Sequence, residues 1–196
     1  NATTSLGAKP GSHECSMYDV LLDSYTVEEA VVSTAWEGLN LLPSSPALAG
    51  ATVELNNLAD PRERARALRY AIQDISGYDY ILVDSPPSLG ILTVNSLCAA
   101  DGVVVPVQCE YLALEGLSQL MHTIRLIQRG LNKSLIMRGV VMTMYDKRTN
   151  LAKEVVAEVQ RYFPKQVFRV LIPRSVRLSE APSYGEPGVL YSPKSQ

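Results

Sequence analysis

The sequence is poor in the residues that build disulfides, structural metal sites and hydrolytic triads. It has three cysteines, an odd number without metal-type spacing, and only two histidines. A disulfide framework, a zinc site and a Ser-His-Asp or Cys-His catalytic arrangement are therefore not expected. We interpret Cys15, Cys98 and Cys109 as reduced thiols of a cytoplasmic protein, with Cys98 in the core because its neighbours are apolar.

Long apolar runs are also missing. No stretch of 18 apolar residues is present that could span a membrane, and no secretory signal is visible, so no membrane partner is expected. With 46% apolar and 19% charged residues over 196 positions, the composition is that of one ordinary globular domain. The chain starts at Asn1 and its last residues, 192–196, have a loop-like composition. We therefore interpret it as part of a longer protein.

Charge is unevenly distributed along the chain. Residues 1–137 carry 8 Lys and Arg against 15 Asp and Glu, whereas residues 138–196 carry 10 against 5. The net charge of −2 thus conceals a basic carboxyl-terminal third. Such a region suits contact with a polyanion, although a solvated basic face gives the same count.

The most informative stretch is GYDYILVDSPPSLG, residues 77–90. Its apolar run at 80–83 is typical of a strand that is buried on both faces of a parallel sheet, and the prolines after it end the strand. Asp84 would then lie at the carboxyl edge of a central strand, where open α/β sheets bind their ligands. On this pattern alone, Asp84 either holds a magnesium ion or caps the next helix, and both interpretations stay open.

Strand and helix patterns alternate along the rest of the chain. Residues 1–11 are expected to form a loop, and Asp60 is expected to cap a helix that begins at Pro61. Because strands alternate with helices, we predict parallel crossovers and a doubly wound α/β sheet. The periodicity predicts strands at 38–43, 102–107, 135–144 and 167–172, and further helices at 17–22, 27–32, 46–58, 91–100, 111–131 and 151–163.

Four ordered segments resemble the ParA/Soj family of chromosome and plasmid partitioning ATPases, which belongs to the deviant Walker A class together with the MinD proteins. The segments are YDYILVDSPPSLGILTVNSL, DGVVVPVQCEYLALEGLSQL, GVVMTMYDKRTNLAKEVV and IPRSVRLSEAPSYGEPGVLY. Their order and separations are more specific than any one of them alone. The segment NATTSLG resembles the end of the family's switch I loop.

One family motif has no counterpart in these residues. The phosphate loop KGGVGKTT, with the first strand and first helix around it, would precede Asn1. The resemblance therefore implies that residues 1–196 are a single partial ATPase domain of the P-loop NTPase-like, mainly parallel type, without its first strand, phosphate loop and C-terminal helix. Because the phosphate donors of that loop are absent, these residues alone are expected to bind ATP poorly.

The resemblance assigns roles to individual positions. Asp84 is similar to the Walker B aspartate, the catalytic position that holds Mg²⁺ through a water, and Ser85 and Pro86 fall in the switch II segment. Asn1 and Thr3 belong to the tail of switch I. Three residues, Met144, Pro173 and Arg174, correspond to the edge that contacts adenine. Four basic residues are placed at a non-specific DNA contact: Lys147, Arg148, Arg174 and Arg177.

The function implied by the resemblance is a nucleotide-dependent switch. ATP and Mg²⁺ would join two subunits into a homodimer that binds non-specific DNA on the bacterial nucleoid, and a ParB/Spo0J-type adaptor would stimulate hydrolysis and release. Two alternatives stay open. A MinD-like ATPase would position itself on a membrane, for which it needs a terminal amphipathic helix. A nucleotide-free remnant would bind only DNA or partners.

Overall fold

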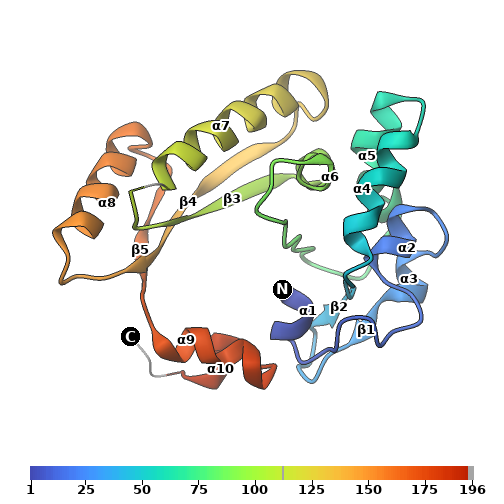
Figure 1. Ribbon diagram of the computed structural model, residues 1–196, viewed down its shortest axis with the longest axis horizontal. Coiled ribbons are helices and arrows are strands. Elements are labelled where there is room, and N and C mark those ends of the chain that lie inside the picture. The colour runs from blue at the N-terminus through green and yellow to red at the C-terminus, as the bar shows by residue number, and fades with distance from the viewer. Residues whose placement is uncertain (112, 194–196) are drawn as a thin grey trace. The chain divides into compact units, whose positions relative to one another are not determined.

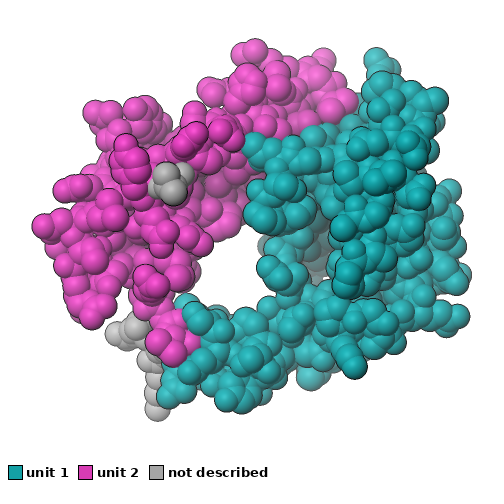
Figure 2. Space-filling model, in the orientation of Figure 1, with its two compact units in different colours: residues 1–99, 177–193 teal, residues 100–176, 194–196 magenta. Residues whose placement is uncertain are grey.

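The computed structural model describes residues 1–111 and 113–193 (Figure 1). It contains two compact units, coloured separately in Figure 2. Unit 1 consists of residues 1–99 and 177–193, and unit 2 contains residues 100–176. Each unit has buried apolar residues of its own. The single domain over residues 1–196 stays a prediction.

Unit 2 is built on a parallel three-stranded sheet. The strand order is β3-β4-β5, and each connection between neighbouring strands contains one long helix, α7 and then α8 (Figure 1). Parallel strands joined by helical crossovers confirm the predicted α/β class, and this arrangement is the repeating part of a doubly wound sheet. The elements are β3 (Gly102–Gln108), α7 (Ala113–Gly130), β4 (Ile136–Tyr145), α8 (Asn150–Tyr162) and β5 (Val167–Pro173).

The central strand of this sheet carries the core of unit 2. Val140 and Met142 of β4 are fully buried. The amphipathic helices contribute one face each, with Ile124 of α7 and Val159 of α8 also almost inaccessible. The nearly continuous apolar sequence of β4 and the apolar faces of the two helices account for this packing.

Unit 1 is mainly helical and includes both the first half of the chain and the segment 177–193. Two short antiparallel strands, β1 and β2, form a hairpin. The elements from the first half are α1 (Ala2–Ser5), α2 (Met17–Leu21), α3 (Val27–Ala30), β1 (Val32–Ser33), β2 (Asn40–Leu41), α4 (Leu48–Asn57), α5 (Pro61–Ile72) and α6 (Ile91–Ala99). The second segment contributes most of α9 (Val176–Glu180), η1 (Ala181–Tyr184) and α10 (Gly188–Tyr191).

Helices α5 and α6 pack against each other in unit 1. Asp60 caps α5 as predicted, because its Oδ1 accepts a hydrogen bond of 2.8 Å from the Arg62 N–H. The buried amide of Asn95 on α6 accepts from the Leu68 N–H at 3.1 Å and donates to the Arg64 carbonyl at 2.7 Å. One side chain therefore bridges two backbone groups of the neighbouring helix and aligns α6, which follows the Asp84 loop.

The strand predicted at 80–83 is wrong for the described residues. These four residues have no strand assignment, and Tyr80 and Leu82 are 85% and 90% exposed. A strand requires a hydrogen-bonded neighbour, and no described strand pairs with this segment. Asp84 accordingly follows an apolar segment that forms no strand pairing, and the expected central strand is not formed.

Three further expectations need correction. Residues 1–11 are not all loop, because α1 forms within them. The helix expected at 27–32 ends at Ala30, and Val32 pairs with Leu41 in the hairpin instead. The chain also forms α9, η1 and α10 near its end, where sequence periodicity predicts no element because each has only four or five residues.

Candidate functional site

Asp84 lies beside the first residues of the chain. Its Oδ2 accepts a hydrogen bond of 3.0 Å from the Ala2 N–H at the start of α1. The carboxylate is 56% exposed. The structure thus brings together Asp84 and the segment that resembles the tail of switch I, although 82 residues separate them in sequence.

The two switch I candidates have different environments. Asn1 is exposed, whereas Thr3 is buried with 4% of its surface accessible. The Thr3 Oγ1 accepts a hydrogen bond of 2.9 Å from the Ser44 N–H. In this arrangement the Thr3 hydroxyl holds α1 against the chain that follows β2, and its burial leaves little access for a nucleotide.

The loop after Asp84 is held by α6. Ser85 is exposed and Pro86 is half-buried. The Thr93 hydroxyl, in the first turn of α6, lies within hydrogen-bond distance of the carbonyls of Pro86 and Ser88. A displacement of this loop would therefore act on the start of α6.

The residues expected near adenine lie at the carboxyl ends of β4 and β5. Tyr145 is opposite Pro173 in the strand pairing, and the Arg174 N–H donates to the Tyr145 carbonyl at 3.0 Å. Met144 has a φ of 54°, which a residue with a side chain rarely adopts. Met144 and Arg174 both line a hollow of about 420 Å³, together with Cys109, Glu110, Tyr111, Asp146, Thr149, Leu151 and Ala152.

One of the predicted DNA contacts is held in an ion pair at this edge. The Arg148 guanidinium donates from Nε to Asp146 Oδ1 at 2.9 Å and from Nη2 to Oδ2 at 2.7 Å. These hydrogen bonds, with one from the Arg148 backbone, hold the pKa of Asp146 well below its ordinary value, and the pair raises the pKa of Arg148. The Asp146 charge offsets that of Arg148, so the pair weakens the attraction of Arg148 for a phosphate.

The other predicted DNA contacts are exposed. Lys147 and Arg174 lie near Arg148 in unit 2, so the structure places three of the four basic residues around the carboxyl ends of β4 and β5. Arg177 belongs to unit 1. Its Nη1 donates to Glu180 Oε2 at 3.3 Å, and interactions with Tyr191 and Glu180 raise its pKa.

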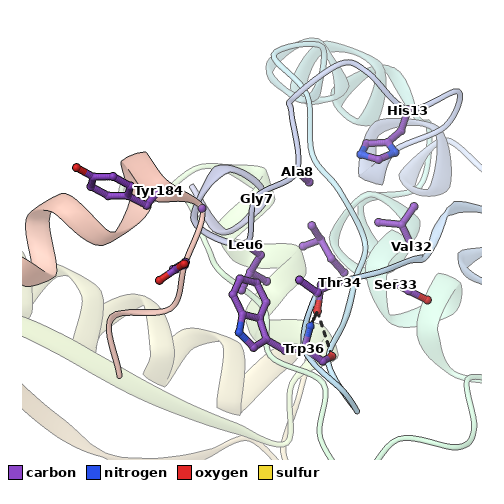
Figure 3. Close-up of a pocket in the computed structure, with 13 residues that line it drawn as sticks. Leu6, Gly7, Ala8, His13, Val32, Ser33, Thr34, Trp36 and Tyr184 are labelled. Carbon is purple, nitrogen blue, oxygen red and sulfur yellow. Dashed lines mark hydrogen bonds between the residues drawn. The ribbon is translucent and has the colours of Figure 1, made fainter. Parts of the chain in front are cut away.

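A second hollow, of about 490 Å³, lies in unit 1 (Figure 3). Side chains from three separate segments line it, including His13, Trp36 and Tyr184. Among the described residues, His13 Nε2 is buried without a hydrogen-bond partner. Sequence reasoning missed this hollow because these residues are far apart along the chain and no local motif links them.

The donor set fits a magnesium ion that is held mainly by water and phosphate. Mg²⁺ in nucleotide sites is bound through one or two carboxylates plus phosphate oxygens and waters. Asp84 offers such a carboxylate, exposed and next to a backbone N–H. Within the described residues, no group of three or more His, Cys, Asp or Glu side chains forms a closed metal cage. An ion that completes its coordination from a bound nucleotide is the kind that suits this position.

Comparison with known proteins identifies the family. Residues 1–137 match the AAA domain family. The whole chain is 48% identical to the sporulation initiation inhibitor protein Soj of Bacillus subtilis, covering 77% of that protein. It is also 50% identical to the chromosome partitioning protein ParA of Myxococcus xanthus, covering 69% of it. The chain belongs to the ParA/Soj family of partitioning ATPases.

Solved structures show the same fold. A cobyrinic acid a,c-diamide synthase from Mycobacterium smegmatis with bound ADP and magnesium is 38% identical, with a TM-score of 0.81 over 98% of this chain and 78% of that chain. The ATP complex of a Cyanothece McdA variant has a TM-score of 0.85 at 20% identity, over 95% and 73%, and shows the shared fold. Among the described residues of the ParA/Soj chain, no helix is long and apolar enough to cross a bilayer.

Proposed function

We propose that the intact protein is an ATP-dependent partitioning switch. It binds ATP with Mg²⁺, forms a nucleotide-bridged homodimer, binds DNA without sequence preference and hydrolyses ATP when a ParB/Spo0J-type adaptor stimulates it. Its task is to segregate chromosomal or plasmid DNA in the bacterial cytoplasm, on the nucleoid. Family membership supports the reaction, and the observation that carries the site assignment is the contact between Asp84 and the Ala2 N–H.

Asp84 has the central role in this proposal. Bound Mg²⁺ supplies positive charge to the terminal phosphates, and Asp84 would orient a water of its coordination shell. The Ala2 N–H would keep the Asp84 carboxylate directed towards the first residues of the chain, with Asn1 and Thr3 near the phosphates. Ser85 and Pro86 would follow the state of the nucleotide through the loop tied to α6. These groups position and stabilise charge, and no Ser-His-Asp chemistry is required.

The remaining site residues divide between base and DNA contact. Met144, Pro173 and Arg174 would contact the adenine at the carboxyl edge of β4 and β5, where the hollow of unit 2 lies. Lys147, Arg148, Arg174 and Arg177 would bind phosphates of DNA. Such contacts neutralise charge and read no base, so affinity should fall steeply with salt.

Substitution of Asp84 tests the nucleotide site. In the intact protein, Asp84→Ala should lower Mg²⁺-dependent ATP hydrolysis by at least about 100-fold, because the ion loses its carboxylate. Asp84→Asn should act similarly while keeping an oxygen for the Ala2 N–H. Asp79→Asn is the matched control, since it removes a charge from the same exposed segment. Normal turnover in either Asp84 variant would reject the assignment.

Charge reversal at Arg177 tests the DNA contact. Arg177→Glu should abolish retention on DNA and leave ATP-dependent dimerisation intact, and Arg177→Gln should reduce the salt slope of binding by about 1. Arg161→Glu is the control, because Arg161 is also exposed and pairs with a glutamate three residues away. Electrophoretic mobility shifts at several salt concentrations give the measurement. Undiminished low-salt binding by Arg177→Glu would contradict the proposal.

Two experiments separate this proposal from the alternatives. Co-sedimentation of the intact protein with DNA and with anionic liposomes distinguishes a partitioning ATPase from a MinD-like membrane protein. Sequencing the region that encodes residues before Asn1 distinguishes an ATPase from a nucleotide-free remnant, since KGGVGKTT there would supply the phosphate donors.

A further inference from the structure

Two glycines from opposite ends of the described chain meet backbone to backbone in unit 1. Gly7 follows α1 and has a φ of 79°, and Gly185 follows η1 and has a φ of 67°. A Cβ added at Gly185 would lie 2.5 Å from the Gly7 Cα and 3.0 Å from the Gly7 nitrogen. A Cβ at Gly7 would lie 3.3 Å from the Gly185 carbonyl oxygen. A side chain at Gly185 would therefore clash with the Gly7 backbone, and one at Gly7 would crowd the Gly185 carbonyl on a backbone conformation that favours glycine.

Gly7, on one side of this contact, is connected to Asp84 through α1. α1 occupies the short interval between Asn1 and Gly7, and it is held at its start by the bond from the Ala2 N–H to Asp84. Thr3 fixes the middle of the helix through Ser44, and the Gly7 N–H donates to the Thr4 carbonyl at 3.1 Å. Residues 1–7 are thus one hydrogen-bonded piece that reaches from the Asp84 carboxylate to the glycine contact.

Gly185, on the other side, is connected to Arg177 through η1 and α9. The Gly185 N–H donates to the Pro182 carbonyl and the Glu186 N–H to the Ala181 carbonyl, both at 3.2 Å, and Ala181 is buried. Glu180 accepts from Arg177 at 3.3 Å and from the Tyr191 hydroxyl at 3.4 Å. The rings of Tyr184 and Tyr191 stack with centroids 5.1 Å apart. Residues 177–191 therefore form a second connected piece.

We propose that Gly7 and Gly185 are positioning residues that couple the surroundings of Asp84 to the segment that carries Arg177. The two connected pieces touch through backbone atoms, and a rigid contact passes a displacement of one piece to the other. The Gly7–Gly185 contact itself does not depend on the proposed function. Only its effect on DNA retention rests on that function. If Asp84 lies by the nucleotide and Arg177 on DNA, the Gly7–Gly185 contact makes DNA retention respond to the nucleotide.

Backbone amide exchange tests the contact without nucleotide. In the intact protein, Gly185→Ala should lose protection in residues 177–191 and also in residues 1–8, because the Cβ forces the two pieces apart. Gly7→Ala should cause the same change in a milder form, which keeps the test usable if Gly185→Ala folds poorly. Gly11→Ala is the matched control: Gly11 has a φ of 77°, and an added Cβ meets no atom within 4 Å. Equal effects of Gly7→Ala and Gly11→Ala, or none, would overturn the proposal.

The functional readout distinguishes coupling from simple structural support. In Gly185→Ala, DNA retention should no longer change between ATP and ADP, whereas in the control Gly11→Ala it should change as in the wild type. ATP-dependent retention that survives in Gly185→Ala would overturn the coupling. Failure of the wild-type protein to hydrolyse ATP would overturn the proposed function instead, and the exchange experiment would still decide the Gly7–Gly185 contact.

Discussion

Residues 80–83 and 102–107 have the same kind of sequence and different structures. Both are short, apolar and rich in β-branched or aromatic residues. Residues 102–107 form most of β3, which pairs with β4, whereas residues 80–83 pair with no described strand and are exposed. The comparison shows that an apolar run supplies the propensity for a strand, while a hydrogen-bonded neighbour supplies the strand itself.

The largest difference in stability should come from placing a charge in the paired sheet and, separately, in the unpaired segment 80–83. In the 196-residue chain, Val140→Asp should lower the free energy of unfolding by more than about 4 kcal/mol, because Val140 is fully buried beside β3 and β5 and the charge would have no partner. Leu82→Asp should change it by less than about 0.5 kcal/mol, since that side chain is exposed. Urea unfolding measures both. A large loss in Leu82→Asp would show that residues 80–83 are packed.

A smaller loss of stability, equal in the two units, is expected when a helix cap is removed, because a cap is determined by local sequence. Asp60 caps α5 in unit 1, and the Thr149 hydroxyl accepts from the Ala152 N–H to cap α8 in unit 2. Asp60→Ala and Thr149→Ala should each lower the free energy of unfolding by about 1 kcal/mol, since each leaves one helix N–H without its partner. Thermal unfolding of the variants gives the measurement. A difference of several-fold between the two caps would mean that tertiary context controls them.

The smallest effect is a change in the pKa of Asp146, which forms an exposed ion pair with Arg148 in unit 2. Because the pair lowers the pKa of Asp146 in the folded chain, its contribution is present above the ordinary pKa of the carboxyl and is lost as pH falls through the lowered value. Arg148→Gln should raise the pKa of Asp146 towards about 3.9, as followed by NMR during acid titration. Lys147→Gln, which removes the neighbouring charge, should leave the titration of Asp146 unchanged. No change in Arg148→Gln would contradict the pairing.

Several elements could be predicted because their determinants are local. Asp60 and Pro61 mark the start of α5, and the periodic apolar faces of α7 and α8 lie buried as expected. The candidate site was less predictable. Asp84 could be selected from its position after an apolar run, but its contact with Ala2 spans 82 residues. The hydrogen bond between Thr3 and Ser44 also depends on a partner that is distant in sequence and that the pattern does not specify.

The sequence by itself determined the capped start of α5, the parallel α/β class and the family, because a capping residue, apolar periodicity and ordered motifs are all present in the order of residues. The tertiary structure alone decided which apolar run pairs as a strand, which hydroxyl is already bonded and which glycines touch. These outcomes depend on groups that meet across long separations, such as Gly7 and Gly185. The physical reason is that hydrogen bonds and close packing require a partner in space, and a local pattern does not identify that partner.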